Sequence, residues 1–197
     1  MLEHLLEIER DWFFAINGTH TWWLDHIMLA FASPWAWFPT VFFVLFFFLK
    51  RRKEWMLMFI CTVLTAVGTS IVTEILVKPF FTRFRPTNHP LFMDNVRVLD
   101  EYVANGVYGF ISGHSANAFA FAVMSALILK NKWYTTTILL WATVMVYSRV
   151  YLAAHFISDV VPGLLVGAFM GWFVYRATHM IVSARSIQGE MLENIDK

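Results

Sequence analysis

Long hydrophobic stretches separated by short polar breaks make up most of the chain. Five of them are predicted to be membrane-spanning helices: residues 35–49, 55–77, 115–129, 135–151 and 157–175. A helix needs about 20 apolar residues to cross a bilayer, so the shorter stretches are expected to continue into the polar loops beside them. The pattern predicts an all-α protein, a multi-pass membrane helical bundle with about five transmembrane helices.

Two shorter stretches precede the first predicted span. Residues 2–16 show helical periodicity, with Leu5, Trp12 and Ile16 on one face and most of the charged side chains on the other. Residues 22–32 form a second short apolar stretch. We expect both to be interfacial amphipathic helices that lie in the membrane surface.

The sequence indicates a single domain, because it contains no internal repeat and no change of composition that would separate two units. We expect this domain to cover residues 1–197. Its parts would be interfacial N-terminal helices (1–33), a catalytic transmembrane core (34–176) and a cytoplasmic tail (177–197).

Composition agrees with a membrane protein and excludes other classes. The chain is 58% hydrophobic and 15% charged, whereas an ordinary soluble domain has about 25% charged residues. The net charge is +1 and the basic residues are not gathered on one stripe, so we expect no binding of nucleic acid. The single cysteine, Cys61, excludes an intrachain disulfide.

The distribution of positive charge predicts the orientation of the chain. Lysine and arginine follow the first, third and fifth predicted spans, at 50–53, 130–132 and 176–185. Because such segments stay in the cytoplasm, the connection 78–114 should lie on the opposite, extracytoplasmic side. That connection nevertheless carries several cations, and a bound phosphate would explain why they are kept there.

Three short strings carry the candidate chemistry. They are Lys78-x6-Arg85-Pro86, Ser112-Gly113-His114 and Ser148-Arg149-x5-His155-x3-Asp159. In the predicted topology all three fall on the extracytoplasmic face, although they come from distant parts of the sequence. They combine side chains that bind phosphate with histidines that can transfer a proton or a phosphoryl group.

The cations suit a phosphate ester. An arginine guanidinium can hold two phosphate oxygens at once, and a lysine adds a compact charge. Lys78, Arg85 and Arg149 could therefore clamp the three non-bridging oxygens. Ser112 and Gly113 directly precede a predicted helix, and the N-terminus of a helix favours an anion.

The histidines supply the reaction. His155 and Asp159 are spaced i, i+4, which would place them on one face of a helix. Asp159 could then bind one imidazole nitrogen and leave the other free to attack phosphorus. His114 could protonate the departing alkoxide and later deprotonate a water molecule. Two other interpretations are that the histidines are simply interfacial residues, or that these three side chains bind a metal, which the nearby cations oppose.

Several residues near the strings keep two interpretations. Arg83 could contact a lipid headgroup or take part in catalysis. Glu74, an acidic residue in a predicted span, could be functional or could pair with Lys78. The outer loop 87–110 could recognise a substrate headgroup or simply be solvated.

The three strings resemble the type 2 phosphatidic acid phosphatase (PAP2) superfamily, whose pattern is K-x6-RP, PSGH and SR-x5-H-x3-D, and the resemblance covers residues 35–176. It implies a helical membrane core and metal-independent hydrolysis through a phosphohistidine, with no cofactor. It implies that His155 is the nucleophile, Asp159 its partner and His114 the acid and base. The phosphate-binding residues that it implies are Lys78, Arg85, Ser112, Gly113 and Arg149. One departure is Ile111, which replaces the usual proline, and we expect little loss because proline only shapes the loop.

The resemblance also implies a function. Members of this size and topology are similar to bacterial inner-membrane lipid phosphatases or pyrophosphatases with a periplasmic active site. Their substrates would be undecaprenyl pyrophosphate, phosphatidylglycerophosphate, phosphatidic acid or lipid A phosphates. A lipid phosphotransferase with the same intermediate is an alternative. A non-enzymatic lipid or anion transporter is less favoured, because matched broken helices are missing from the two halves of the sequence. The sequence does not indicate an oligomeric state.

Overall fold

The computed structural model describes residues 2–49, 55–99, 102, 104 and 106–195. The basic cluster predicted at 50–53 lies outside the described residues. Within them the chain is helical, and its β-structure is one isolated bridge between Phe84 and Tyr108. The predicted all-α class is therefore confirmed.

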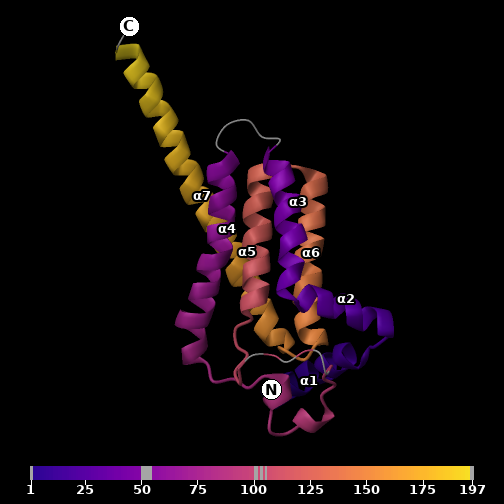
Figure 1. Cartoon of the computed structure of the whole chain (residues 1–197). Coiled ribbons are helices and arrows are strands. Elements are labelled where there is room, and N and C mark those ends of the chain that lie inside the picture. Colours follow the sequence, from indigo (N-terminus) through magenta and orange to yellow (C-terminus); the bar gives the residue numbers. More distant parts are fainter. Residues whose placement is uncertain (1, 50–54, 100–101, 103, 105, 196–197) are drawn as a thin grey trace.

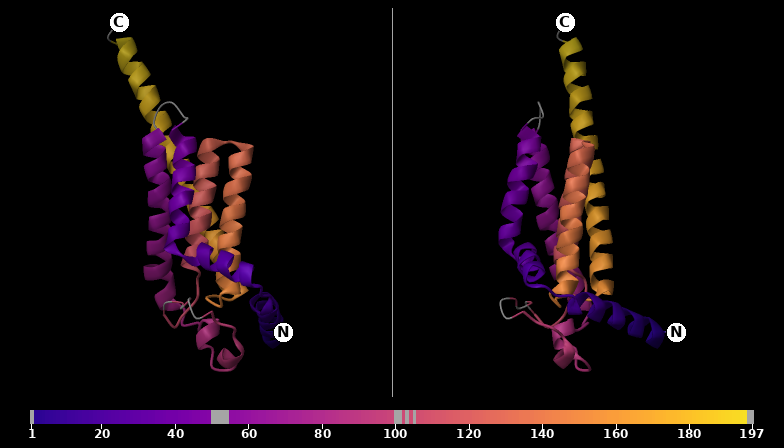
Figure 2. Two further views of the ribbon diagram at one scale, coloured as in Figure 1. Left: turned by 45° about the vertical axis from the view of Figure 1, so that its right-hand side comes forward. Right: turned by 90° about the vertical axis from the view of Figure 1, so that its right-hand side faces the viewer.

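Seven α-helices follow one another within the described residues. They are α1 (Leu2–Gly18), α2 (Trp22–Ala32), α3 (Trp37–Leu49), α4 (Trp55–Ile71), α5 (Gly113–Leu129), α6 (Lys132–Tyr151) and α7 (Ile157–Ile195). Helix α4 continues as a π-helix, Val72–Val77. Helices α3 to α7 run side by side as a bundle, and α1 and α2 lie across one end of it (Figures 1 and 2).

The predicted helices are found, but two or three of the described helical segments are long and apolar enough to span a membrane, compared with the five predicted spans. Two helical stretches, Met56–Phe80 and Ile157–Ile181, are long and apolar enough to cross a membrane within the described part of the chain. A third qualifies if α2 and the segment Pro34–Leu49 count together, and these two pieces are bent by 77°. Helix α5 is shorter, with 17 residues, and it is packed inside the bundle rather than against lipid.

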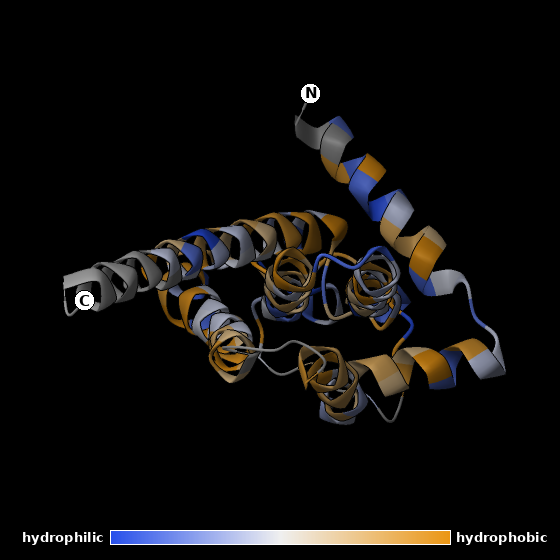
Figure 3. Ribbon diagram, turned by 90° about the horizontal axis from the view of Figure 1, so that it is seen from above, coloured by the Kyte–Doolittle hydropathy of each residue, from blue (hydrophilic) through white to orange (hydrophobic). Residues whose placement is uncertain are grey.

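Helix α1 has an apolar and a charged face, as predicted, whereas α2 turns Asp25 toward the bundle, where it binds Arg97 and Tyr151, and exposes apolar side chains such as Trp22. Seen from above, both alternate between hydrophilic and hydrophobic positions along their length (Figure 3). On α1, Phe13 is fully buried and packs edge-to-face against Phe156, which directly precedes α7. Trp12 and Leu6 of the same helix stay exposed. Helix α1 is thus attached to the bundle on one side and offers apolar side chains to the membrane interface on another.

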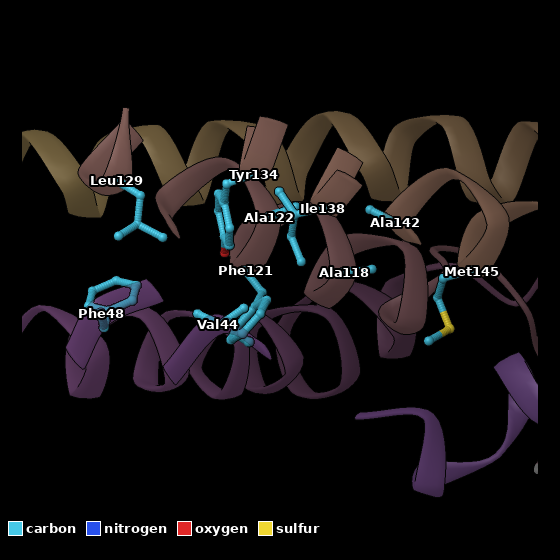
Figure 4. Packing of buried hydrophobic residues seen from close by; sticks show 11 residues of the cluster. Val44, Phe48, Ala118, Phe121, Ala122, Leu129, Tyr134, Ile138, Ala142 and Met145 are labelled. Carbon is cyan, nitrogen blue, oxygen red and sulfur yellow. The ribbon is translucent and has the colours of Figure 1, made fainter. Parts of the chain in front are cut away.

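A buried hydrophobic cluster joins α3, α5 and α6 (Figure 4). Its core includes Val44 and Phe48 of α3, Phe121 of α5, and Tyr134 and Ile138 of α6. Large apolar side chains elsewhere on α3, α4 and α7 remain exposed, such as Phe42, Leu64 and Leu165. In a bilayer these positions face lipid, which explains an apolar surface that water would not tolerate.

Helices α5 and α7 approach each other most closely along a stripe of glycines. Gly163, Gly167 and Gly171 repeat every four residues on α7. A Cβ atom added at these glycines would lie 2.7, 2.0 and 2.6 Å from the carbonyl oxygens of Ser112, Ala116 and Ala120 respectively. Small residues at such spacing allow membrane helices to pack backbone to backbone. The glycine repeat is visible in the sequence, but the sequence prediction did not include the close packing of α5 and α7 that it allows.

The glycine stripe gives a direct test of the packing. Gly167→Ala should lower the free energy of unfolding by about 3 kcal/mol or more, because the new methyl group would overlap the Ala116 carbonyl. The matched control is Gly68→Ala in α4, where an added Cβ meets no atom within 4 Å. The control should be neutral or gain up to about 1 kcal/mol through helix propensity. Unfolding in mixed micelles measures both, and equal stability of the two variants would contradict the account.

Candidate active site

The three strings meet at one end of the bundle. The connection from α4 to α5 and the connection from α6 to α7 lie at the same end as α1 and α2 (Figure 1). A cavity of about 680 Å³ opens there, and six of the predicted site residues line it: Lys78, Arg85, Gly113, His114, Arg149 and His155. The other two, Ser112 and Asp159, are fully buried behind its wall. The sequence prediction that the strings converge is confirmed.

The end of α6 places Arg149 and His155. Arg149 is 1% exposed, and its Nε and Nη2 donate to the Ser148 hydroxyl at 3.2 and 3.0 Å. The chain then turns through Ala153, whose φ of 56° is left-handed. A residue with a side chain adopts this conformation at a cost that is typical of functional sites. The turn lets the His155 amide donate to the Arg149 carbonyl at 3.2 Å, which holds the backbones of the two residues together.

The two nitrogens of His155 face different partners. Nε2 lies 3.1 Å from Arg85 Nη1, and Nδ1 lies 3.8 Å from Asp159 Oδ2. The expectation that His155 and Asp159 share one helix face is wrong, because His155 precedes α7, which begins at Ile157. The Nδ1–Oδ2 distance is longer than a hydrogen bond, and Nδ1 has no hydrogen-bond partner among the described protein atoms. His155 Nδ1 and Asp159 Oδ2 therefore lie near each other but do not form a hydrogen bond.

Burial keeps the nucleophile candidate neutral. The His155 side chain is 4% exposed, and burial lowers the pKa of its imidazole to about 4, with the Arg85 charge adding to the effect and Asp159 opposing it. Because the imidazole is uncharged at neutral pH, one ring nitrogen keeps a lone pair, and the 3.1 Å contact with the Arg85 Nη1 donor identifies it as Nε2.

Arg85 and Lys78 enter the cavity from the connection after α4. Arg85 is fixed by the main chain: its Nε donates to the Gly106 carbonyl at 3.0 Å and its Nη1 to the Ala154 carbonyl at 2.7 Å. The Lys78 Nζ binds both carboxylate oxygens of Glu74, at 2.6 and 2.5 Å. Glu74 therefore pairs with Lys78, one of its two predicted interpretations. It lies on the π-helix Val72–Val77, a distortion often found at functional sites.

The start of α5 contributes differently from what its motif suggests. His114, its second residue, faces the cavity. Gly113 leaves room for the Glu74 carboxylate, because a Cβ would lie 2.7 Å from Glu74 Oε1 and would push that side chain aside. The hydroxyl of Ser112 accepts from the Ser115 amide at 3.4 Å and the Ser115 hydroxyl at 2.9 Å, so it caps the helix. Phosphate binding by Ser112 stays a prediction, and its cap role was not foreseen.

One residue that sequence reasoning left open proves to be part of the site. Arg83 Nη1 donates to Asp159 Oδ1 at 2.7 Å. The other oxygen, Oδ2, accepts from the Phe156 amide at 2.9 Å. The sequence signal was an unexplained cation two residues before Arg85, in a segment where cations are not expected.

Comparisons with known proteins agree with this geometry. The family model described as the PAP2 superfamily matches residues 56–183. The chain belongs to the PAP2 superfamily. It is 37% identical over 177 residues to a lipid A 4'-phosphatase of Porphyromonas gingivalis, covering 89% of this chain and 75% of that protein. It is 28% identical to a lipid A 4'-phosphatase of Bacteroides thetaiotaomicron, covering 93% of this chain and 82% of the relative.

Solved structures share the fold of this PAP2 chain. A PAP2-type phosphatidylglycerolphosphate phosphatase from Bacillus subtilis superposes with a TM-score of 0.70 at 22% identity, over 90% of this chain and 88% of the other. LpxE from Aquifex aeolicus superposes with a TM-score of 0.63 at 25% identity, over 84% and 93%. Family, relatives and apolar helices together support a membrane-embedded lipid phosphatase.

The lowered pKa of His155 predicts how stability depends on pH. In the unfolded chain a histidine binds its proton below about pH 6.5, whereas folded His155 stays neutral down to about pH 4. The free energy of unfolding should therefore fall by up to about 3 kcal/mol as the pH falls through this window. A His155→Gln variant lacks this titration and should lose less stability on acidification. Unfolding in mixed micelles at each pH measures the difference, with His26→Gln at an exposed position as the control. Parallel curves for wild type and His155→Gln would contradict the assignment.

Proposed function

We propose that this PAP2 chain is a lipid phosphatase that removes a phosphate monoester from lipid A by way of a phosphohistidine at His155. The convergence of three cations and two histidines on one cavity carries the proposal. The choice of lipid rests on the 37% identical relative, which is named a lipid A 4'-phosphatase.

The first step is transfer of the phosphoryl group to the enzyme. Arg85, Arg149 and Lys78 bind the non-bridging oxygens, and Lys78 exchanges its Glu74 partner for the substrate. His155 Nε2 attacks phosphorus in line once Arg85 Nη1 has moved from it to a phosphate oxygen. The bond to the sugar oxygen breaks as that oxygen takes a proton from His114, which the negative charge of the bound phosphate keeps protonated. Asp159 closes on Nδ1 as charge develops on the imidazole ring. The clamp supplies most of the stabilisation, because phosphoryl transfer depends mainly on position and charge.

The second step releases phosphate. His114, now neutral, removes a proton from a water molecule, which attacks phosphorus and breaks the bond to His155. Both steps use only side chains of this protein, so the mechanism requires no metal ion.

An apolar groove beside the cavity supports a lipid substrate. It has a volume of about 580 Å³ and lies between the bend that joins α2 to α3 and the side of α6. Ser33 lines both the groove and the catalytic cavity, so the two spaces adjoin. Acyl chains in this groove would remain in the hydrocarbon layer while the headgroup reaches the clamp.

The proposal places the enzyme in the bacterial inner membrane with its cavity on the periplasmic face. Lys130 follows α5 and Lys132 begins α6. The connection between these helices lies at the end of the bundle opposite α1 and α2 (Figure 1). Positively charged connections of this kind stay in the cytoplasm.

Phosphate release by purified protein in detergent with excess EDTA tests the function. Lipid A should release phosphate faster than phosphatidylglycerophosphate, phosphatidic acid or undecaprenyl pyrophosphate. His155→Ala should abolish release, and Asp159→Asn should lower kcat by about 100-fold or more. Release that requires an added divalent metal would overturn the mechanism. Phosphorylated lipid in place of free phosphate would instead show a phosphotransferase.

Cysteine labelling in spheroplasts tests the orientation. In a Cys61→Ser background, Leu91→Cys and Trp133→Cys each place one thiol at a side chain that is 85% or 86% exposed, in the outer loop and at the opposite end respectively. A membrane-impermeant maleimide should label the first in intact spheroplasts and the second only after lysis. The reverse pattern would mean that the active site faces the cytoplasm.

A further inference from the structure

The carboxylate of Asp159 is held by contacts outside the catalytic cavity. It is 0% exposed, and a buried carboxylate needs a compensating charge. His155 does not supply one, because its imidazole is neutral and 3.8 Å away. Arg83 supplies it through the 2.7 Å contact to Oδ1, while the Phe156 amide fixes Oδ2. Arg83 therefore determines which oxygen of Asp159 faces His155.

Arg83 is in turn held by the N-terminal helix α1. Its Nη2 donates to Glu9 Oε2 at 2.6 Å, and its guanidinium lies 4.8 Å from the centre of the Phe156 ring. Glu9 Oε1 also accepts from the amide of Ser158 at 3.0 Å and from the Ser158 hydroxyl. The amide belongs to the first turn of α7, where main-chain donors have no partner within the helix. Glu9 thus joins α1 to the element that carries Asp159.

The charges of Glu9, Arg83 and Asp159 also favour a role in orienting His155. Two carboxylates, Glu9 and Asp159, share the single guanidinium of Arg83. Together Glu9, Asp159 and Arg83 carry one excess negative charge on the Nδ1 side of the imidazole, while the Arg85 guanidinium lies on the Nε2 side at 3.1 Å. The Asp159 carboxylate can then stabilise the positive charge that develops on the ring during attack. Without Glu9, Arg83 would bind Asp159 alone, and the carboxylate would stabilise that charge less.

We propose that Arg83 and Glu9 are positioning residues for the nucleophile, and that docking of α1 against the bundle completes the active site. The inference rests on the proposed function, in which His155 attacks phosphorus. It goes beyond the family match, which covers residues 56–183 and so does not include Glu9. Arg83 acts through Asp159 and does not itself touch the substrate.

Kinetics of variants that remove the charge of Arg83 or Glu9 test this positioning role. Arg83→Gln should lower kcat by about tenfold or more and Glu9→Gln by about threefold, with KM changed by less than about twofold. Arg83→Lys should recover part of the loss, because it restores the charge. The matched control is Glu7→Gln, on the same helix, with a side chain that is 62% exposed, and it should match the wild type. Unchanged kcat in Arg83→Gln would overturn the proposal.

Combination with Asp159→Asn separates positioning from a purely structural role. If Arg83 acts through Asp159, then Arg83→Gln should cause no further loss of kcat in the Asp159→Asn background. Losses that multiply would mean that Arg83 only tethers α1, and would overturn the inference.

Vanadate binding gives a second readout that needs no turnover. Vanadate can form the five-coordinate geometry of phosphoryl transfer, so its affinity should fall in Arg83→Gln but not in Glu7→Gln. If the wild type turns over lipid and Arg83→Gln behaves identically, this inference is wrong but the proposed function is not affected. Wild-type protein that neither releases phosphate nor binds vanadate would defeat the proposed function, and the inference with it.

Discussion

Close contact between α5 and α7 is the constraint on which the rest of the structure depends. The glycines of α7 remove the side chains that would hold the two backbones apart, and the Ser112 amide donates to the Asp159 carbonyl at 3.0 Å across the contact. This register brings the start of α5, with His114, beside the start of α7, where Asp159 follows His155. The proposed acid, His114, lies in α5, and the proposed nucleophile, His155, lies just before α7. Their relative position therefore depends on this packing more than on either motif.

The site that results is rich in buried charge, and its cations are held by other protein groups. Arg85 is held by two carbonyls and by His155 Nε2, and Arg149 is held by the Ser148 hydroxyl, so other protein groups place both guanidinium groups at the cavity. Such preorganisation suits a reaction whose barrier is set mainly by charge. Lys78 differs, because it is paired with the Glu74 carboxylate. In the proposed mechanism, phosphate binding therefore exchanges one anion for another at Lys78.

The hydrophobic pattern predicted the helices well. The predicted topology also placed the three strings at one end of the bundle, where they are found. Helix α2 has the predicted bounds, and α4 with its π-helical extension covers residues 55–77 as expected. What the sequence did not reveal depends on contacts between distant segments. The left-handed turn at Ala153 takes His155 out of the helix, which residue spacing alone cannot show. The link from Glu9 to Arg83 joins residues 74 positions apart, and no periodicity within either segment encodes it.

The central claim is that His155 carries the phosphoryl group, and trapping the intermediate tests it most directly. Purified protein would be mixed with lipid A labelled with radioactive phosphate, quenched in alkali within one turnover, and digested so that the labelled peptide can be sequenced. The account predicts label on the peptide that contains His155, stable in alkali and released by mild acid, as expected of a phosphohistidine. Label on another residue, or phosphate release in a single turnover without a labelled enzyme, would contradict it.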